Sequence, residues 1–283
     1  MIQNIHNLPG YAFGKVINNF NIEEAVAKLN QTELQELLFE NKLLIFKELL
    51  MTPDQFERLA SILGELEISP IAEYQMQDRP CIGIQSNVVK NGKKQGFDNA
   101  GMYWHTDGSW QNVPAIATLL YCIDAPAIGG ETLFVDMCAT YTDLPERMKQ
   151  KVEQLKGFYP YVEIYEKEVE DRGLNSLTQE EKNKYTDVSH PIVRTHPITK
   201  QRALYINEKY LKNIYGIYEQ ESKKILDYLY AFSTQEFRIY KHRWEQNDLL
   251  IWDNGSIMHK AMKPDKKYHK TTNKITIKGS IPE

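Results

Sequence analysis

The chain has 283 residues, of which 42% are hydrophobic and 25% are charged, the composition of an ordinary globular protein. Collagen-like, mucin-like and disordered chains are excluded by these values. The 34 basic and 38 acidic residues leave a formal net charge of -4, so no global basic field attracts nucleic acid or anionic lipid. We therefore expect a small molecule as the partner, and neither a nucleic acid nor a membrane.

The cysteines predict a reducing compartment. Cys81, Cys122 and Cys138 are odd in number and show no Cys-x-x-Cys spacing, which argues against both a disulfide framework and a cysteine zinc site. The first residues carry no cationic segment followed by an apolar stretch, and the apolar runs are far shorter than the ~20 residues of a membrane span. The expected location is cytoplasmic, and a homo-oligomer remains open.

The N-terminal part, about 20–65, is predicted to be helical. Thr52 can cap a helix with Pro53 at its first position and Gln55 three residues on, and Gly64 can end it. The apolar residues of this helix share one face that needs a sheet to cover it: Phe56, Leu59, Ile62 and Leu63.

Beyond residue 82 the pattern changes to short β-branched and aromatic runs separated by turns. These predict strands at 115–122, 132–135, 203–207, 248–252 and 274–278, with helices at 145–155 and 220–232. The expected fold is mainly β with peripheral helices, a barrel or jelly roll. Because neither a linker nor a repeat divides the chain, we expect a single domain over 1–283. A charged stretch within about 160–190 is expected to be an exposed loop insertion that can serve as a lid.

The sharpest local signal is Trp-His-Thr-Asp-Gly at 104–108. At a strand end, residues two apart project to the same face, which places His105 beside Asp107. A third ligand must come from elsewhere, and His259 follows an apolar strand and a turn-forming Asp-Asn-Gly sequence. Two imidazoles and one carboxylate are the ligand set of non-haem Fe(II) oxygenases. Taken alone, the His-x-Asp pattern also fits a capped turn with a surface histidine.

The spacing beyond this motif is more specific. Twenty-four residues separate Asp107 from Thr132, which follows Gly129 and Gly130. Here the sequence resembles the taurine dioxygenase-like (TauD/TfdA) family of Fe(II)/2-oxoglutarate-dependent oxygenases, whose pattern is His-x-Asp, 24 residues, Thr, a long interval, His, ten residues, Arg. Further segments occur in family order at 191–197, 203–208, 243–244, 247–248 and 252–254, so the resemblance covers about 43–279.

The resemblance implies a double-stranded β-helix, the cupin-like jelly roll. It implies His105, Asp107 and His259 as iron ligands, with Thr132 helping to hold 2-oxoglutarate. It also implies a dioxygenase that uses Fe(II), 2-oxoglutarate and O₂ and releases succinate and CO₂. The remaining histidines, which are rival third ligands, are then interpreted as structural: His6, His190, His196, His242 and His269.

One departure concerns the co-substrate. Ten residues after His259, where the family has an arginine for the distal carboxylate of 2-oxoglutarate, this chain has Lys270. Lysine keeps the charge but lacks the planar fork that grips a carboxylate through two parallel bonds. We assign Lys270 to the co-substrate, and weaker affinity, a shifted pose or a different oxo acid all stay open.

Substrate-side positions differ as well. Lys274 stands where the taurine enzyme has a second arginine, although the lysine-rich tail at 260–278 is also explained as a solvated face. Ser69 and Ala72 replace a histidine and a tyrosine, and Gly101 replaces an asparagine, which disfavours taurine. Two further positions complete the predicted substrate side, Gly108 after the metal aspartate and Tyr210, which is also explained as core.

Three functional hypotheses follow. The first is a dioxygenase that hydroxylates, desaturates or oxidatively cleaves a small anionic metabolite, such as an amino-acid-derived compound. The second is a metal-binding jelly roll that has lost 2-oxoglutarate turnover or uses another oxo acid, and the third is a structural or interaction module. The presence of all three ligands together with Thr132 favours the first.

Overall fold

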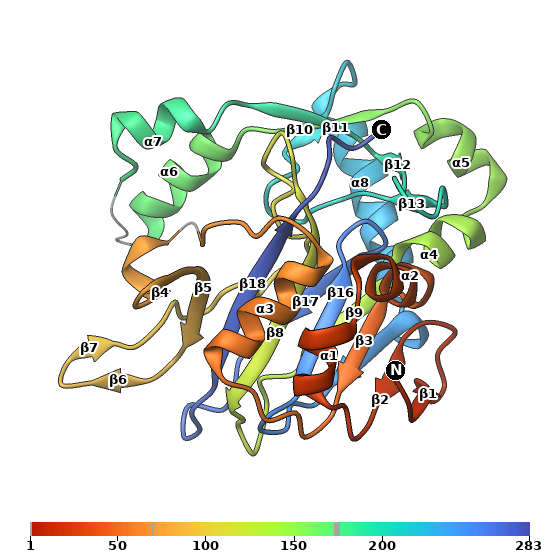
Figure 1. The fold of residues 1–283 in the computed structure, drawn as a ribbon. Helices are drawn as coiled ribbons and strands as arrows, with labels where there is room; N and C mark the ends of the chain where they lie inside the picture. The colour runs from red at the N-terminus through yellow and green to blue at the C-terminus, as the bar shows by residue number, and fades with distance from the viewer. Residues whose placement is uncertain (1, 70, 173–175) are drawn as a thin grey trace.

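The computed structural model describes residues 2–69, 71–172 and 176–283. The larger sheet has the strand order β1 (Ile5–Asn7), β2 (Lys15–Ile17), β3 (Leu43–Phe46), β16 (Leu249–Asp253), β8 (Ala115–Asp124), β18 (Thr271–Lys278), β5 (Arg79–Ser86) and β4 (Gln75–Met76). The strands β2 and β3 pair in parallel, and the other neighbours pair antiparallel (Figure 1). Neighbouring strands are far apart in the sequence, so the sheet brings distant segments together.

Each central strand divides its apolar residues between two faces, as the alternation of a strand requires. In β16, Leu249 and Ile251 pack with the N-terminal helices, whereas Leu250 and Trp252 pack on the opposite face with Phe134. That opposite face is covered by a smaller sheet with the order β15 (Ile239–His242), β9 (Thr132–Asp136) and β17 (Ile257–Ala261). Two facing sheets therefore enclose one apolar layer.

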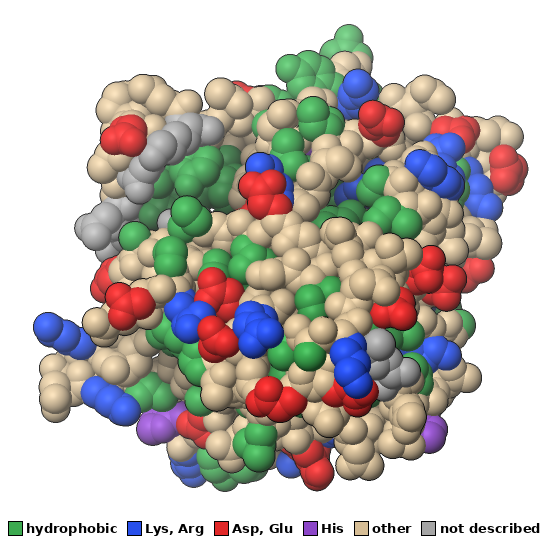
Figure 2. All heavy atoms as spheres, viewed as in Figure 1, with side chains coloured by type: hydrophobic (Ala, Val, Ile, Leu, Met, Phe, Trp, Pro, Cys, Tyr) green, Lys and Arg blue, Asp and Glu red, His purple; other side chains and the backbone are tan. Residues whose placement is uncertain are grey.

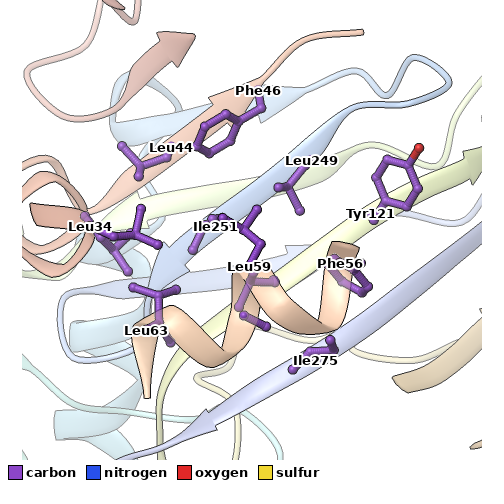
Figure 3. Packing of buried hydrophobic residues seen from close by; sticks show 14 of the residues in the cluster. Leu34, Leu44, Phe46, Phe56, Leu59, Leu63, Tyr121, Leu249, Ile251 and Ile275 are labelled. Atoms are coloured by element: carbon purple, nitrogen blue, oxygen red, sulfur yellow. The ribbon is translucent and has the colours of Figure 1, made fainter. Parts of the chain in front are cut away.

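The helices α1 (Ile22–Lys28), α2 (Gln31–Asn41) and α3 (Pro53–Leu63) cover the outer face of the larger sheet (Figure 1). The capping box predicted for α3 is present, because Gln55 N–H donates to Thr52 Oγ1 at 3.2 Å and Thr52 N–H donates to Gln55 Oε1 at 2.8 Å. Figure 3 shows Phe56, Leu59 and Leu63 of α3 pointing onto the sheet. The helical prediction for 20–65 holds, with the buried strand β3 inserted between α2 and α3.

A third apolar cluster lies around the helices of the later chain. These helices are α4 (Met137–Asp143), α5 (Glu146–Val152) and α8 (Glu219–Ser233). The same part of the chain forms a three-stranded sheet with the order β11 (Val188–Pro191), β10 (Lys156–Tyr159) and β14 (Asn213–Ile214). It also forms a two-stranded sheet of β12 (Val193–Thr195) and β13 (Arg202–Leu204). Smaller elements are the hairpin β6 (Val89–Lys90) and β7 (Lys93–Lys94) and the 3₁₀ turns η1 (Ala72–Tyr74) and η2 (Glu236–Arg238). The strand predicted at 203–207 ends at Leu204, because Asn207 accepts hydrogen bonds from the backbone of the following turn.

The sequence predicts a loop at 160–190, and this prediction is wrong. The segment forms α6 (Tyr161–Arg172) and α7 (Gln179–Lys184), although residues 173–175 lie outside the described part. Tyr161 and Ile164 of α6 share one helix face and pack on the apolar cluster of the later chain. The many charged residues of the segment conceal this amphipathic spacing.

The surface agrees with the small net charge. Figure 2 shows acidic and basic side chains interspersed over one face of the molecule. In the part of the chain that the structure describes, no helix is long and apolar enough to cross a membrane.

Candidate metal centre and cavity

His105 and His259 lie on paired backbones. His105 N–H donates to the carbonyl of His259 at 2.9 Å, and His259 N–H donates to the carbonyl of His105 at 2.8 Å. Asp107 follows in the adjoining turn, with its Oδ1 3.7 Å from His105 Nε2 and its Oδ2 3.7 Å from His259 Nε2. The three buried side chains thus offer ligand atoms that all lie within 4.8 Å of one another. This is a compact donor set for one metal ion.

Neighbouring groups orient the candidate ligands. His105 Nδ1 lies 2.7 Å from the carbonyl of Tyr103, which fixes a proton there and leaves Nε2 free to bind a metal. Gly101 makes room for this ring, because a Cβ at residue 101 would lie 2.6 Å from His105 Cε1. On the other side, the Thr118 hydroxyl donates to Asp107 Oδ2 at 2.7 Å, and Asn254 Nδ2 donates to that hydroxyl at 2.8 Å.

The charges of the cluster suit metal binding. Burial alone would raise the pKa of Asp107, but the ammonium of Lys274, 2.6 Å from Oδ1, and the two imidazoles hold that pKa well below its ordinary value. Burial, together with the neighbouring His105, lowers the pKa of His259 well below its ordinary value. An ionised carboxylate and a neutral imidazole are the forms that bind a metal.

A cavity of about 490 Å³ opens beside this cluster. Thr132 lines it, and the indole N–H of Trp244 donates to the Thr132 hydroxyl at 3.0 Å. Lys270 also lines it, with its Nζ 2.7 Å from the carbonyl of Gly130 and 5.0 Å from the centre of the Trp244 ring. A Cβ at residue 130 would lie 2.8 Å from Pro126 Cγ and 3.3 Å from Lys270 Cδ, so glycine leaves space for both side chains. Trp244 therefore contacts both residues predicted to hold the co-substrate.

Lys270 is a desolvated cation. Burial lowers its pKa to about 8, even though Cys122 and Glu131 act in the opposite direction. Within the described residues its ammonium forms no ion pair, and its partners are a carbonyl and an aromatic face. A buried ammonium without an anion is a favourable place for a ligand carboxylate.

The predicted substrate-side residues line the same cavity: Lys274, Tyr210, Gly108 and Ser69. Lys274 is held in the ion pair with Asp107, so it is not part of a solvated lysine face. That alternative does describe other lysines of the tail, which are exposed: Lys263, Lys266, Lys267 and Lys278. Tyr210 is buried, and its ring lies 5.9 Å from that of Tyr103.

The rival histidines are engaged elsewhere. His190 Nε2 lies 2.8 Å from the carbonyl of Gln111, and His196 and His242 face the carboxylates of Asp253 and Asp248 at 3.2 and 3.1 Å. The other two are exposed, His6 and His269. His259 is therefore the histidine that the fold brings to His105 and Asp107.

Several residues of the site carried no predicted role. Thr118 could have been noticed as a hydroxyl within the apolar run of β8, but its contact with Asp107 depends on the fold of the 108–114 turn. Trp252, whose ring lies 4.7 Å from that of His259, has the sequence pattern of an ordinary core residue. The same holds for Trp244 and for the cavity residues Tyr103 and Trp110.

Comparison with known proteins identifies the class. Residues 4–273 match the family described as taurine catabolism dioxygenase TauD, TfdA family, and the chain belongs to this family. It is 26% identical over 271 residues to an alpha-ketoglutarate-dependent 2,4-dichlorophenoxyacetate dioxygenase of Cupriavidus pinatubonensis, with 89% of this chain and 90% of the relative covered. It is 28% identical over 267 residues to pentalenolactone F synthase of Streptomyces avermitilis, with 90% and 87% covered.

Solved structures share the fold. A taurine dioxygenase from Burkholderia xenovorans has a TM-score of 0.78 at 22% identity, covering 98% of this chain and 90% of that chain. AAD-2 in complex with Mn(II) and N-oxalylglycine has a TM-score of 0.78 at 24% identity, covering 98% of each chain. The predicted sheet-rich fold with peripheral helices and the predicted family are confirmed. The protein is an Fe(II)- and 2-oxoglutarate-dependent dioxygenase that acts with O₂ on a small molecule.

Proposed function

We propose that this enzyme hydroxylates, desaturates or oxidatively cleaves a small metabolite that carries an anionic group, such as an amino-acid-derived compound. The observation that carries this proposal is the presence of two lysines, Lys270 and Lys274, on one cavity. One cation is enough for the distal carboxylate of 2-oxoglutarate, so the second is available for an acidic group of the substrate. Two relatives are named for a 2,4-dichlorophenoxyacetate and a sulfate ester, both of which carry an anionic group.

His105, Asp107 and His259 would hold the iron. The residues fit this ion for three reasons. His105 has its Nδ1 against the carbonyl of Tyr103, His259 is neutral, and the carboxylate of Asp107 is ionised. Bound Fe(II), together with 2-oxoglutarate and O₂, supplies the oxidation of a substrate C–H bond coupled to the conversion of 2-oxoglutarate into succinate and CO₂. Thr118 keeps the Asp107 carboxylate oriented toward the two imidazoles.

Thr132 and Lys270 would hold 2-oxoglutarate. The hydroxyl of Thr132 is positioned by Trp244, and the desolvated ammonium of Lys270 forms no ion pair within the described residues. Lysine binds a carboxylate as a point charge, without the two parallel bonds of an arginine. We therefore expect the co-substrate to be held mainly by charge.

We further propose that the two facing sheets form a double-stranded β-helix and that residues 1–283 make one domain. The segment at 160–190 would act as a lid, because Tyr185 lines the cavity and Tyr161 stacks on Trp110 with ring centres 4.0 Å apart. Closing such a segment excludes water from the reacting groups. The cytoplasmic location and a homo-oligomeric state stay predictions.

The test is succinate formation by protein loaded anaerobically with Fe(II) and then exposed to O₂ and 2-oxoglutarate, screened over amino acids, sulfonates and other organic acids. We expect at least one acid to accelerate succinate release. Lys274→Ala should remove most of this acceleration, whereas Lys278→Ala, on the same strand but paired with Glu65 at the surface, should keep it. Equal rates in the two variants, or no acceleration by any acid, would contradict the proposal.

A further inference from the structure

A second carboxylate, that of Glu67, lines the cavity close to Lys274. Glu67 N–H donates to the carbonyl of Thr276 at 2.9 Å, so this segment lies along the edge of β18. Residues 274 and 276 are two apart on β18, and both line the cavity. The side chain of Glu67 is thereby placed beside the residue that we assign to the substrate acid.

Nothing in the described part of the fold neutralises Glu67. Within the described ranges its carboxylate forms no ion pair. Burial raises its pKa, as does the nearby Asp107, and the Thr276 side chain, Lys274 and Lys278 only partly oppose this rise. Glu65, two residues earlier, lies outside the cavity and forms an ion pair with Lys278 at 3.1 Å. Such an ion pair at the surface is the ordinary arrangement of a glutamate.

When iron and 2-oxoglutarate are counted in the cavity, the formal charges of one cationic and one anionic residue remain unassigned. The carboxylate of Asp107 and both carboxylates of 2-oxoglutarate are balanced by a divalent iron and the ammonium of Lys270. Lys274 and Glu67 remain, one cation and one anion. A substrate with only a negative charge would match Lys274 and bring a like charge toward Glu67. A substrate with both charges matches both residues.

Resting on the proposed function, we propose that Glu67 is a specificity residue that binds an ammonium group of the substrate, which is an amino acid or another amine-bearing acid. The acidic group of the substrate contacts Lys274. An ammonium has three donors, so Lys274 can keep its bond to Asp107 and still donate to the substrate. The two carboxylate oxygens of Glu67 can accept hydrogen bonds from the substrate ammonium.

The aromatic lining of the cavity suits an apolar side chain. Tyr103, Trp110 and Tyr210 line it, and their rings are packed against one another and against Tyr161. The cavity thus offers charged residues for the two ionised groups of the substrate and aromatic rings for its remaining atoms. This combination suits an amino acid with an aromatic or aliphatic side chain.

Matched pairs of acids test the inference. L-phenylalanine and 3-phenylpropionate, L-tyrosine and 3-(4-hydroxyphenyl)propionate, and L-leucine and 4-methylpentanoate differ in each case by the amino group. Their binding to the Fe(II)- and 2-oxoglutarate-loaded protein is measured anaerobically by calorimetry. In wild type at least one amino acid should bind at least about tenfold more tightly than the matched acid without an amino group. The acid without an amino group leaves the carboxylate of Glu67 without a cation.

The variants separate Glu67 from the rest of the site. Glu67→Gln should reduce this preference at least about fivefold, while the surface control Glu65→Gln keeps it. Equal binding within every pair in wild type, an unchanged preference in Glu67→Gln, or no binding of any of the three amino acids would overturn the inference. Succinate formation accelerated by an acid without an amino group, with equal binding within the pairs, would leave the proposed function intact and remove only the role of Glu67.

Discussion

The backbones of His105 and His259 are joined by a reciprocal pair of hydrogen bonds, at 2.9 and 2.8 Å. These two residues are far apart in the sequence, and the pairing sets their imidazoles beside each other with ring centres 4.1 Å apart. His259 belongs to β17, which pairs in turn with β9. The candidate metal centre therefore depends on sheet geometry for the placement of its third ligand, which favours precise positions.

The first prediction concerns the cation for the co-substrate. Lys270→Ala should raise the dissociation constant of 2-oxoglutarate at least tenfold, because loss of one member of a buried charge pair costs on the order of 2–5 kcal/mol. Binding is followed anaerobically through the Fe(II) charge-transfer absorption. Lys266→Ala, an exposed lysine of the same segment, is the control. Equal affinities in both variants would place Lys270 outside the co-substrate site.

The pH dependence of 2-oxoglutarate binding should report the same lysine. The pKa of Lys270 is lowered to about 8, and only the charged form attracts a carboxylate. Affinity should be constant below this pH and fall as pH rises through it, by up to about tenfold per pH unit. Lys270→Arg stays charged over this range and should show no such fall. A wild-type affinity that is the same at pH 7 and pH 9 would contradict this role of the ammonium.

Trp244 should act as a positioning residue for Thr132. Trp244→Phe removes the indole donor to the Thr132 hydroxyl but keeps an aromatic face for Lys270. Because a hydrogen bond contributes about 0.5–1.5 kcal/mol, the 2-oxoglutarate dissociation constant should rise roughly 2- to 12-fold. Trp110→Phe, which alters a cavity residue in contact with Tyr161 and Tyr210, should leave this constant unchanged. An unaltered constant in Trp244→Phe would show that Thr132 needs no such support.

The packing of α3 on the larger sheet should dominate stability in this region. Leu59 is fully buried between α3 and the sheet (Figure 3), so Leu59→Ala should lower the free energy of unfolding by about 2–5 kcal/mol. Leu50 is 73% exposed, and Leu50→Ala should change the free energy of unfolding by less than about 0.5 kcal/mol. Urea denaturation followed by circular dichroism measures both. Similar losses for the two variants would contradict this packing.

Local patterns predicted the features that depend on neighbours in the chain. The capping residues gave the limits of α3, and the two-residue spacing of His105 and Asp107 gave one side of the metal centre. The family spacing then supplied Thr132, which can be counted from Asp107. A long interval separates Thr132 from His259, so His259 rests on the apolar strand and turn before it and on the family resemblance.

Contacts made by strand register could not be predicted in this way. The position of Thr118 against Asp107 follows from the fold of the 108–114 turn, and that of Glu67 near Lys274 follows from the pairing of residue 67 with Thr276 of β18. No local pattern specifies either contact. The helix α6 was missed because its charged residues outnumber the apolar ones that pack. The charge density of the segment thus indicated a loop where the structure has a helix that packs one face on the core.

The central claim is that His105, Asp107 and His259 hold the iron, and anaerobic titration with Fe(II) in the presence of 2-oxoglutarate tests it most directly. Wild type should develop the visible charge-transfer absorption at one iron per chain. His259→Ala should fail to develop it and bind Fe(II) at least about 100-fold more weakly, since even changes around a metal ligand cost 10–100-fold. The exposed-histidine control His269→Ala should behave as wild type. The same absorption and the same iron affinity in His259→Ala as in wild type would contradict the assignment.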